Sequence, residues 1–183
     1  PLYSSAASDV YKRQVLQLAV GPDDIVYAQT GAGIAQFAGE RCKPVEDIAA
    51  EALFATLPPY PSLEASIDGP GAVRDVAQDA DTIAVAAENG LFVGNGTEWK
   101  LTLPGEGDVR WAPVDVRAAG YDNEGHLWFA SPQGVGYRIA EGNWRLLTGK
   151  EGLPDNDFTC LAAGPQGVWF GTTNGAIRYI DGA

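Results

Sequence analysis

The chain has 183 residues, of which 45% are hydrophobic, so it can bury a sizeable core and is not expected to be disordered. Its 12 lysines and arginines stand against 24 aspartates and glutamates, which gives a formal net charge of −12. This acidic composition does not provide the positively charged surface that is expected of a nucleic-acid-binding protein. No apolar run reaches the length of a membrane span.

The first 14 residues are predicted to be foreign to the protein. Residues 9–14, Asp-Val-Tyr-Lys-Arg-Gln, resemble the translation of a transposon end that is used to prepare sequencing libraries. Residues 1–14 are therefore interpreted as an assembly artefact and are excluded from the fold prediction.

From residue 15 onward, one pattern recurs: a short run of small apolar residues, a turn, an aromatic-rich run, a glycine and a further short run. The marker glycines Gly90, Gly134 and Gly175 lie 44 and then 41 residues apart. A period of about 40–45 residues with four short strands is typical of a β-propeller blade. The predicted blades cover approximately residues 15–45, 73–103, 114–148 and 157–183.

Each copy divides into four predicted strands. The innermost is rich in small residues because inner strands of a propeller converge on a central channel, and the second supplies bulky groups that pack one blade against the next. The third begins at the marker glycine, and the outermost begins near Trp99 or Trp144. The sequence thus predicts an all-β fold of four-stranded antiparallel blades, about four repeats long. Because the last copy ends before its outer strand, a partial propeller from a longer protein is expected, with apolar blade faces left uncovered.

Residues 46–70 are predicted to be an insertion between the first two blades. Apolar residues from Val45 through Leu53 to Leu57 follow helical spacing, and the prolines of residues 58–61 are expected to end that helix.

The sequence offers little for catalysis. A nucleophilic triad would need the one histidine, His126, as its base, but this residue lies in a predicted turn and is interpreted as solvated. Cys42 and Cys160 are predicted to fill buried space, and with a single histidine they do not form a zinc-ligand pattern. Residues 122–125 are interpreted as a turn and not as a calcium loop. No catalytic residue, metal site or cofactor is therefore predicted.

Polar residues gather where a propeller channel is expected to open. Loops that enter the inner strands, and turns between second and third strands, ring one mouth of such a channel, where amides and carboxylates can bind a sugar or a peptide. The alternative is that each is an ordinary turn residue. The candidate rim consists of Asn89, Trp111, Gln133, Asp155, Asn156, Asp157 and Asn174.

The last copy carries a more specific pattern. Its Gly-Leu-Pro-Asp-Asn turn at residues 152–156, its strand at 167–172 and its segment 175–179 resemble the two-component regulator propeller repeat. The third copy shares the pattern, with Tyr137 and Arg138 in reversed order, and the resemblance extends over residues 73–183 and 15–45. It implies a sensor domain of a bacterial signalling protein, periplasmic or extracellular, that recognises ligands such as oligosaccharides and works with further blades and an output domain.

Three functions are compared on this basis. The leading hypothesis is a non-catalytic ligand sensor. A scaffold for protein–protein interaction is the alternative, because an acidic surface suits it equally. A propeller lyase or glycosidase is the third, with Asp155 and Asp157 as its available carboxylates, although two carboxylates in one loop rarely flank a scissile bond.

Overall fold

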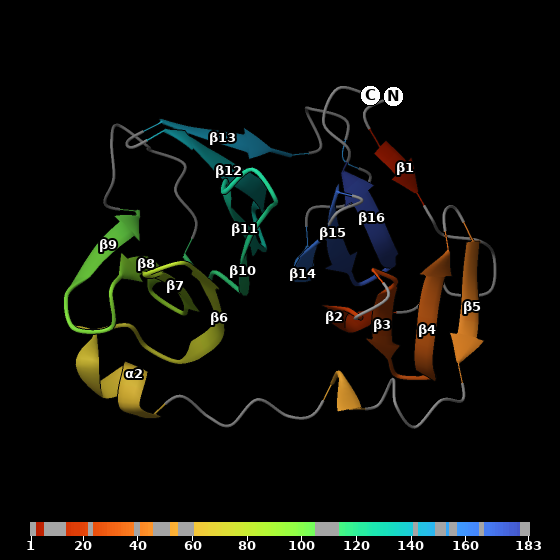
Figure 1. Ribbon diagram of the computed structural model, residues 1–183, viewed down its shortest axis with the longest axis horizontal. Helices are drawn as coiled ribbons and strands as arrows, with labels where there is room; N and C mark the ends of the chain where they lie inside the picture. Colours follow the sequence, from red (N-terminus) through yellow and green to blue (C-terminus); the bar gives the residue numbers. More distant parts are fainter. Residues whose placement is uncertain are drawn as a thin grey trace.

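The computed structural model describes residues 3–5, 14–21, 24–38, 41–45, 52–54, 61–104, 114–140, 143–148, 153, 157–164 and 167–179. These residues form four sheets, each of four antiparallel strands, which confirms the predicted all-β architecture of repeated blades. Figure 1 shows the sheets side by side around an arc, with the innermost strands β2, β6, β10 and β14 toward its centre.

The strands follow one another regularly in each blade. The first blade comprises β2 (Val15–Val20), β3 (Val26–Thr30), β4 (Gly33–Ala38) and β5 (Arg41–Val45). The second comprises β6 (Val73–Asp79), β7 (Thr82–Ala87), β8 (Gly90–Gly94) and β9 (Trp99–Leu103). The third comprises β10 (Ala118–Tyr121), β11 (Leu127–Ser131), β12 (Gly134–Ala140) and β13 (Asn143–Leu147). The fourth comprises β14 (Phe158–Gly164), β15 (Gly167–Thr172) and β16 (Gly175–Tyr179), with β1 (Tyr3–Ser5) at its outer edge.

The marker glycines are required by the turn between the second and third strands. Gly90 and Gly134 have φ angles of 139° and 149°, a region that side chains disfavour. A Cβ atom at either position would also collide with a carbonyl oxygen of the outermost strand, that of Leu103 or Leu147. Backbone geometry at this turn therefore explains why a glycine recurs once in each repeat.

The blades are not arranged in the order of the sequence. Strand β6 packs beside β10, β10 beside β14, and β14 and β15 beside β2, so the first blade lies next to the fourth. The spatial order is second, third, fourth, first, and the first and second blades form the two ends of the arc (Figure 1). This open arrangement is a partial propeller, as predicted.

Aromatic side chains fill the spaces between neighbouring blades. Trp128 of the third blade packs against Phe170 and Tyr179 of the fourth, and Trp169 of the fourth packs against Phe37 of the first, 4.8 Å between ring centroids. Burial of each large apolar side chain stabilises the fold by roughly 2–3 kcal/mol. The alternation along β11 and β15 sends successive side chains to opposite neighbouring blades.

Most of the helix predicted between Val45 and Leu57 lies outside the described residues, and the described helix of the insertion lies further along the chain. Val45 is the last residue of β5, so the helix expected to begin there is wrong at its start, and the described helix α2 spans Pro61–Ser66. Residues 46–51 and 55–60 lie outside the described residues. Pro61, the last of the prolines expected to end the predicted helix, is the first residue of α2, because its fixed φ suits the first helical position, where no N–H group is needed.

The α2 region covers the face of the second blade that points away from the third. Leu63 and Ile67 pack against Phe92, Trp99 and neighbouring apolar residues of that blade. The second blade therefore does not expose the bare apolar face that was expected of a partial propeller.

The outer edge of the fourth blade pairs with the start of the chain. Tyr3 to Ser5 run antiparallel to β16, with Tyr3 opposite Tyr179. Pairing of this kind uses backbone groups, so an exposed strand edge accepts segments of many sequences. The interpretation of residues 1–14 as an artefact stays a prediction.

Candidate functional site

The turns between strands lie at two opposite ends of the sheets. Because consecutive strands of a blade are antiparallel, the turns between first and second strands lie opposite the turns between second and third strands. We call the end that holds the second-to-third turns and the starts of the inner strands the entry end, and the other the pocket end. All candidate rim residues that the structure describes belong to the entry end.

The three rim amides occupy equivalent turns. Asn89, Gln133 and Asn174 each precede a marker glycine, and all three are exposed. The Asn89 side chain donates a hydrogen bond to the Gly69 carbonyl oxygen at 2.9 Å. Trp111, Asp155 and Asn156 lie outside the described residues.

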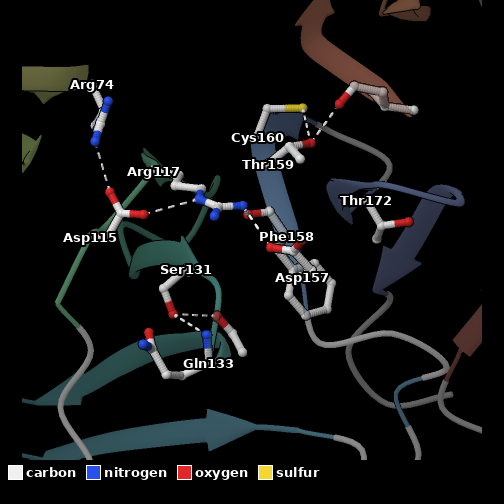
Figure 2. A network of polar contacts seen from close by, with 12 residues as sticks. Arg74, Asp115, Arg117, Ser131, Gln133, Asp157, Phe158, Thr159, Cys160 and Thr172 are labelled. Atoms are coloured by element: carbon white, nitrogen blue, oxygen red, sulfur yellow. Dashed lines mark hydrogen bonds and ion pairs between the residues drawn. The ribbon is translucent and has the colours of Figure 1, made fainter. Parts of the chain in front are cut away.

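The remaining rim residue, Asp157, belongs to a ladder of ion pairs that crosses three blades (Figure 2). Arg74 at the start of the second blade pairs with Asp115 at 3.1 Å, and Arg117 of the third blade pairs with Asp115 at 3.4 Å and Asp157 at 2.7 Å. Arg117 also donates to the Phe158 carbonyl oxygen at 3.2 Å. We refer to these four charged residues as the ladder.

The ladder follows the repeat. Arg74 and Arg117 occupy the same position near the start of the inner strand, one residue before Asp75 and Ala118, which pair with Ala86 and Ala130 of the second strand. Asp115 and Asp157 lie two residues before this arginine position in their own blades. Thr159 occupies the arginine position of the fourth blade and donates to the Val15 carbonyl oxygen of the first, at 2.5 Å. The sequence analysis missed the ladder, although the 43-residue spacing of the two arginines was a usable signal.

Two further groups lie on inner strands close to the ladder. The Asp75 carboxylate accepts hydrogen bonds from the backbone N–H groups of Val76 at 2.9 Å and, across the blade boundary, Ala119 at 3.2 Å. Burial raises the pKa of Asp75 to about 6 despite these bonds. Burial likewise raises the pKa of the Cys160 thiol to about 12, so this buried thiol stays protonated and unreactive. The side chain of Cys42 lies outside the described residues.

A pocket of about 200 Å³ opens at the pocket end, between the third and fourth blades. Its wall combines the turn between β10 and β11, aromatic residues of both blades and the start of β15. The lining residues are Asp122, Asn123, Glu124, His126, Trp128, Tyr137, Gly164, Gly167, Val168 and Tyr179.

Asp122 organises this wall. One carboxylate oxygen accepts from the backbone N–H groups of Glu124 and His126, both at 2.9 Å. The other accepts from the Trp128 indole at 2.7 Å and lies 3.1 Å from His126 Nδ1. Partial burial acts to raise the pKa of Asp122, but these hydrogen bonds outweigh it and the pKa is lowered. Asp122 therefore stays ionised at neutral pH.

The sequence analysis had interpreted residues 122–125 as a turn and His126 as a solvated residue. The turn is present, with the Gly125 N–H donating to the Asp122 carbonyl oxygen at 3.0 Å. His126 is partly exposed to solvent and also contacts Asp122, a contact that the interpretation as a solvated turn residue did not include. Asp122 and His126 are four residues apart in the sequence, and this spacing within a turn did not indicate that their side chains would be in contact.

The inner wall of the pocket is a group of aromatic rings. Tyr137 stacks on Trp128 with 4.4 Å between centroids, and Tyr179 of the fourth blade lies 5.1 Å from Trp128. His126 lies 5.8 Å from Tyr137. Within the described residues, no three histidine, cysteine, aspartate or glutamate side chains converge as a metal site.

The family comparison agrees with the turn-and-strand pattern of the fourth blade. Residues 152–174 match the family model described as the two component regulator propeller. No curated protein matches the chain at a significant level.

Solved structures share the fold at low sequence identity. The extracellular domain described as that of a hybrid two component system from B. thetaiotaomicron has 15% identity and a TM-score of 0.52, over 98% of this chain and 23% of that one. PorZ, a bacterial surface component of the type-IX secretion system of Porphyromonas gingivalis, has 13% identity and a TM-score of 0.50, over 88% of this chain and 25% of that one. The chain thus spans about a quarter of the length of these structures, and the likeness establishes the propeller fold.

A search for membrane spans gave a negative result. Among the residues that the structure describes, no helix combines the length and apolar character needed to cross a bilayer.

Proposed function

We propose that this chain is a non-catalytic, ligand-sensing part of a propeller from a bacterial signal-transduction protein, and that it binds a small ligand such as an oligosaccharide at the entry end. The observation that carries this proposal is the match of residues 152–174 to the two component regulator propeller model. The fold shared with an extracellular domain of a hybrid two component system supports it.

The geometry of the entry end supports ligand binding there. Three amide side chains project from equivalent turns of neighbouring blades and can donate and accept hydrogen bonds, as recognition of sugar hydroxyl groups requires. The ladder fixes the starts of the inner strands relative to one another, so these turns are held by rigid elements.

The chemical groups of the chain favour binding over catalysis. The buried thiol of Cys160 is protonated, and one ring nitrogen of His126 faces the Asp122 carboxylate. Asp157, one of the two carboxylates considered for hydrolysis, is paired with Arg117. By this proposal the full-length protein contains further blades and an output domain, and the propeller lies outside the cytoplasm.

Gln133 offers a sharp test because its side chain is exposed at the centre of the described rim. The 183-residue chain and its Gln133→Ala and Asn174→Ala variants should be titrated with a panel of neutral oligosaccharides by calorimetry. We expect at least one sugar to bind and both variants to weaken it, while Gln78→Ala, an exposed amide at the pocket end, leaves it unchanged.

Equal binding by all three variants would place the sugar away from the entry end. Absence of sugar binding, together with capture of a stable protein partner by the same surface, would favour the interaction scaffold instead.

A further inference from the structure

We propose that the pocket between the third and fourth blades binds a small organic cation that carries a primary amine or a guanidinium group. This pocket lies at the pocket end, opposite the entry end to which the proposed function assigns sugar binding. The two sites can therefore be tested independently.

The charge of the pocket wall favours a cation. Asp122 stays ionised because four hydrogen bonds stabilise its carboxylate, and Glu124 adds a second carboxylate whose side chain is 72% exposed. Among the lining residues that the structure describes there is no lysine or arginine, although the guanidinium of Arg145, from strand β13, donates to the hydroxyl of the lining residue Tyr137 at 3.4 Å. A positive group entering the pocket would be attracted by two carboxylates. That of Asp122 is held in place by hydrogen bonds, and that of Glu124 is exposed.

His126 supplies a directed acceptor. Its Nδ1 lies 3.1 Å from Asp122 Oδ2 and 3.6 Å from Glu124 Oε2, and two carboxylates at this nitrogen favour the tautomer that carries its proton there. In that tautomer Nε2 is the ring nitrogen that can accept a hydrogen bond. An ammonium or guanidinium N–H group can donate to it, just as a metal or proton donor approaches a histidine oriented by a carboxylate.

The aromatic wall distinguishes a cation from a sugar. Trp128 and Tyr179 are only 2% and 5% exposed, so neither presents a wide flat face on which a pyranose could stack. Tyr137, which stacks on Trp128 and is only partly buried, is the ring that a cation in the pocket can approach, and such electron-rich rings attract cations.

Size supports the same choice. A volume of about 200 Å³ is small for a ligand site and suits a compact molecule better than an oligosaccharide. The ligand class is therefore a short amine or guanidine, either as a free metabolite or as the end of a lysine or arginine side chain of a partner.

The test is calorimetric titration of the 183-residue chain with n-butylamine at neutral pH, with sodium butyrate and methyl glucoside as probes of similar size. We expect binding of butylamine only. Glu124→Gln should weaken it about three- to fivefold, the effect of one partly exposed charge pair. Glu98→Gln, an exposed carboxylate of the second blade, should leave it unchanged.

Separate measurements are needed for where butylamine binds and for whether the ligand is a free amine or a protein side chain. Butylamine should shift the NMR signals of the Trp128 indole N–H and the His126 ring, and Gln133→Ala at the entry end should leave its affinity unchanged. Nα-acetyl-lysine methylamide distinguishes the sources: binding equal to butylamine indicates that a protein side chain can occupy the pocket, and weaker binding indicates a free amine.

The proposal is overturned if butyrate or methyl glucoside binds as well as butylamine, or if butylamine does not bind at millimolar concentration. It is also overturned if Glu124→Gln and Glu98→Gln behave alike. Failure of this site leaves the sugar-binding proposal intact, because that proposal is read from Gln133 and Asn174.

Discussion

Arg117 of the third blade donates to Asp157 of the fourth at 2.7 Å, and so joins two blades through side chains that start their inner strands. The same guanidinium reaches Asp115 and the Phe158 carbonyl oxygen, whereas Arg74 has a single described partner, Asp115. Arg117 is therefore the centre of the ladder, and Arg74 is its end.

Arg117→Ala should lower the free energy of unfolding by about 1–2 kcal/mol, because it removes several charge-assisted hydrogen bonds of a partly buried group. Arg74→Ala should lower it by less than about 1 kcal/mol, since its pair is more exposed. Urea unfolding at low and high salt measures both. Equal effects of the two substitutions would show that Arg117 does not link the blades.

Asp75→Asn should change how stability depends on pH. The pKa of Asp75 is raised from 3.8 to about 6 by burial, so between these values the folded state binds the proton more tightly than the unfolded state. Wild-type stability should consequently fall as pH rises from about 4 to about 6, by at most about 3 kcal/mol. Above pH 6 the full destabilisation is present.

The asparagine variant carries no charge at this position and should lose that slope. It gives up one of the two backbone hydrogen bonds, so it should be less stable than the wild type near pH 4 and closer to it, or more stable, near pH 8. Denaturant unfolding across this range measures the difference. Asp81→Asn, at an exposed position of the same blade, is the control; an identical slope in wild type and Asp75→Asn would contradict the assignment.

Ile67→Ala should destabilise the second blade by about 2 kcal/mol. Ile67 is 5% exposed and covers a blade face that no other described blade contacts, so its loss opens a cavity at the end of the arc. Asp68→Ala, one residue further and exposed, is the matched control. Hydrogen exchange should show faster opening of β7 and β8 in Ile67→Ala, and unchanged protection there would show that α2 does not stabilise the blade.

The sequence determined the blades because local rules govern them. A glycine with positive φ and a tight turn recur at fixed spacing, as at Gly90 and Gly134, and such signals need no tertiary information. The packing of β2 beside β14 could not be predicted in this way, because it joins positions far apart in the chain. The helix prediction was wrong at Val45 because the spacing of this residue and the following apolar residues fits a strand end as well as a helix.

The candidate sites likewise differ in whether local sequence signals can reveal them. Asn89 and Gln133 could be proposed from the sequence because they occupy repeated turns, and both turns lie at the same end of their blades. The pocket was missed because its wall joins Asp122 of one blade to Tyr179 of another, and no local pattern links two such positions.

Trp128 and Trp169 give a matched pair for the hydrogen bond that organises the pocket. They occupy equivalent positions of the third and fourth blades and are 2% and 1% exposed, but their indole N–H groups differ. Trp128 donates to the Asp122 carboxylate at 2.7 Å, while the buried Trp169 N–H has no hydrogen-bond partner among the residues that the structure describes.

Both Trp→Phe substitutions remove similar apolar volume, so that part of the loss should be common to the pair. Trp128→Phe also deprives an ionised carboxylate of its shortest hydrogen bond, and it should therefore cost about 1–2 kcal/mol more than Trp169→Phe. The pKa of Asp122 should rise in Trp128→Phe, since one of the groups that lowers it is lost. Thermal unfolding gives the energies and carboxyl NMR titration gives the pKa. If the two variants lose equal stability and the pKa of Asp122 is unchanged, the indole does not hold the turn, and the charge in the pocket depends on the His126 ring and on the backbone N–H groups of Glu124 and His126.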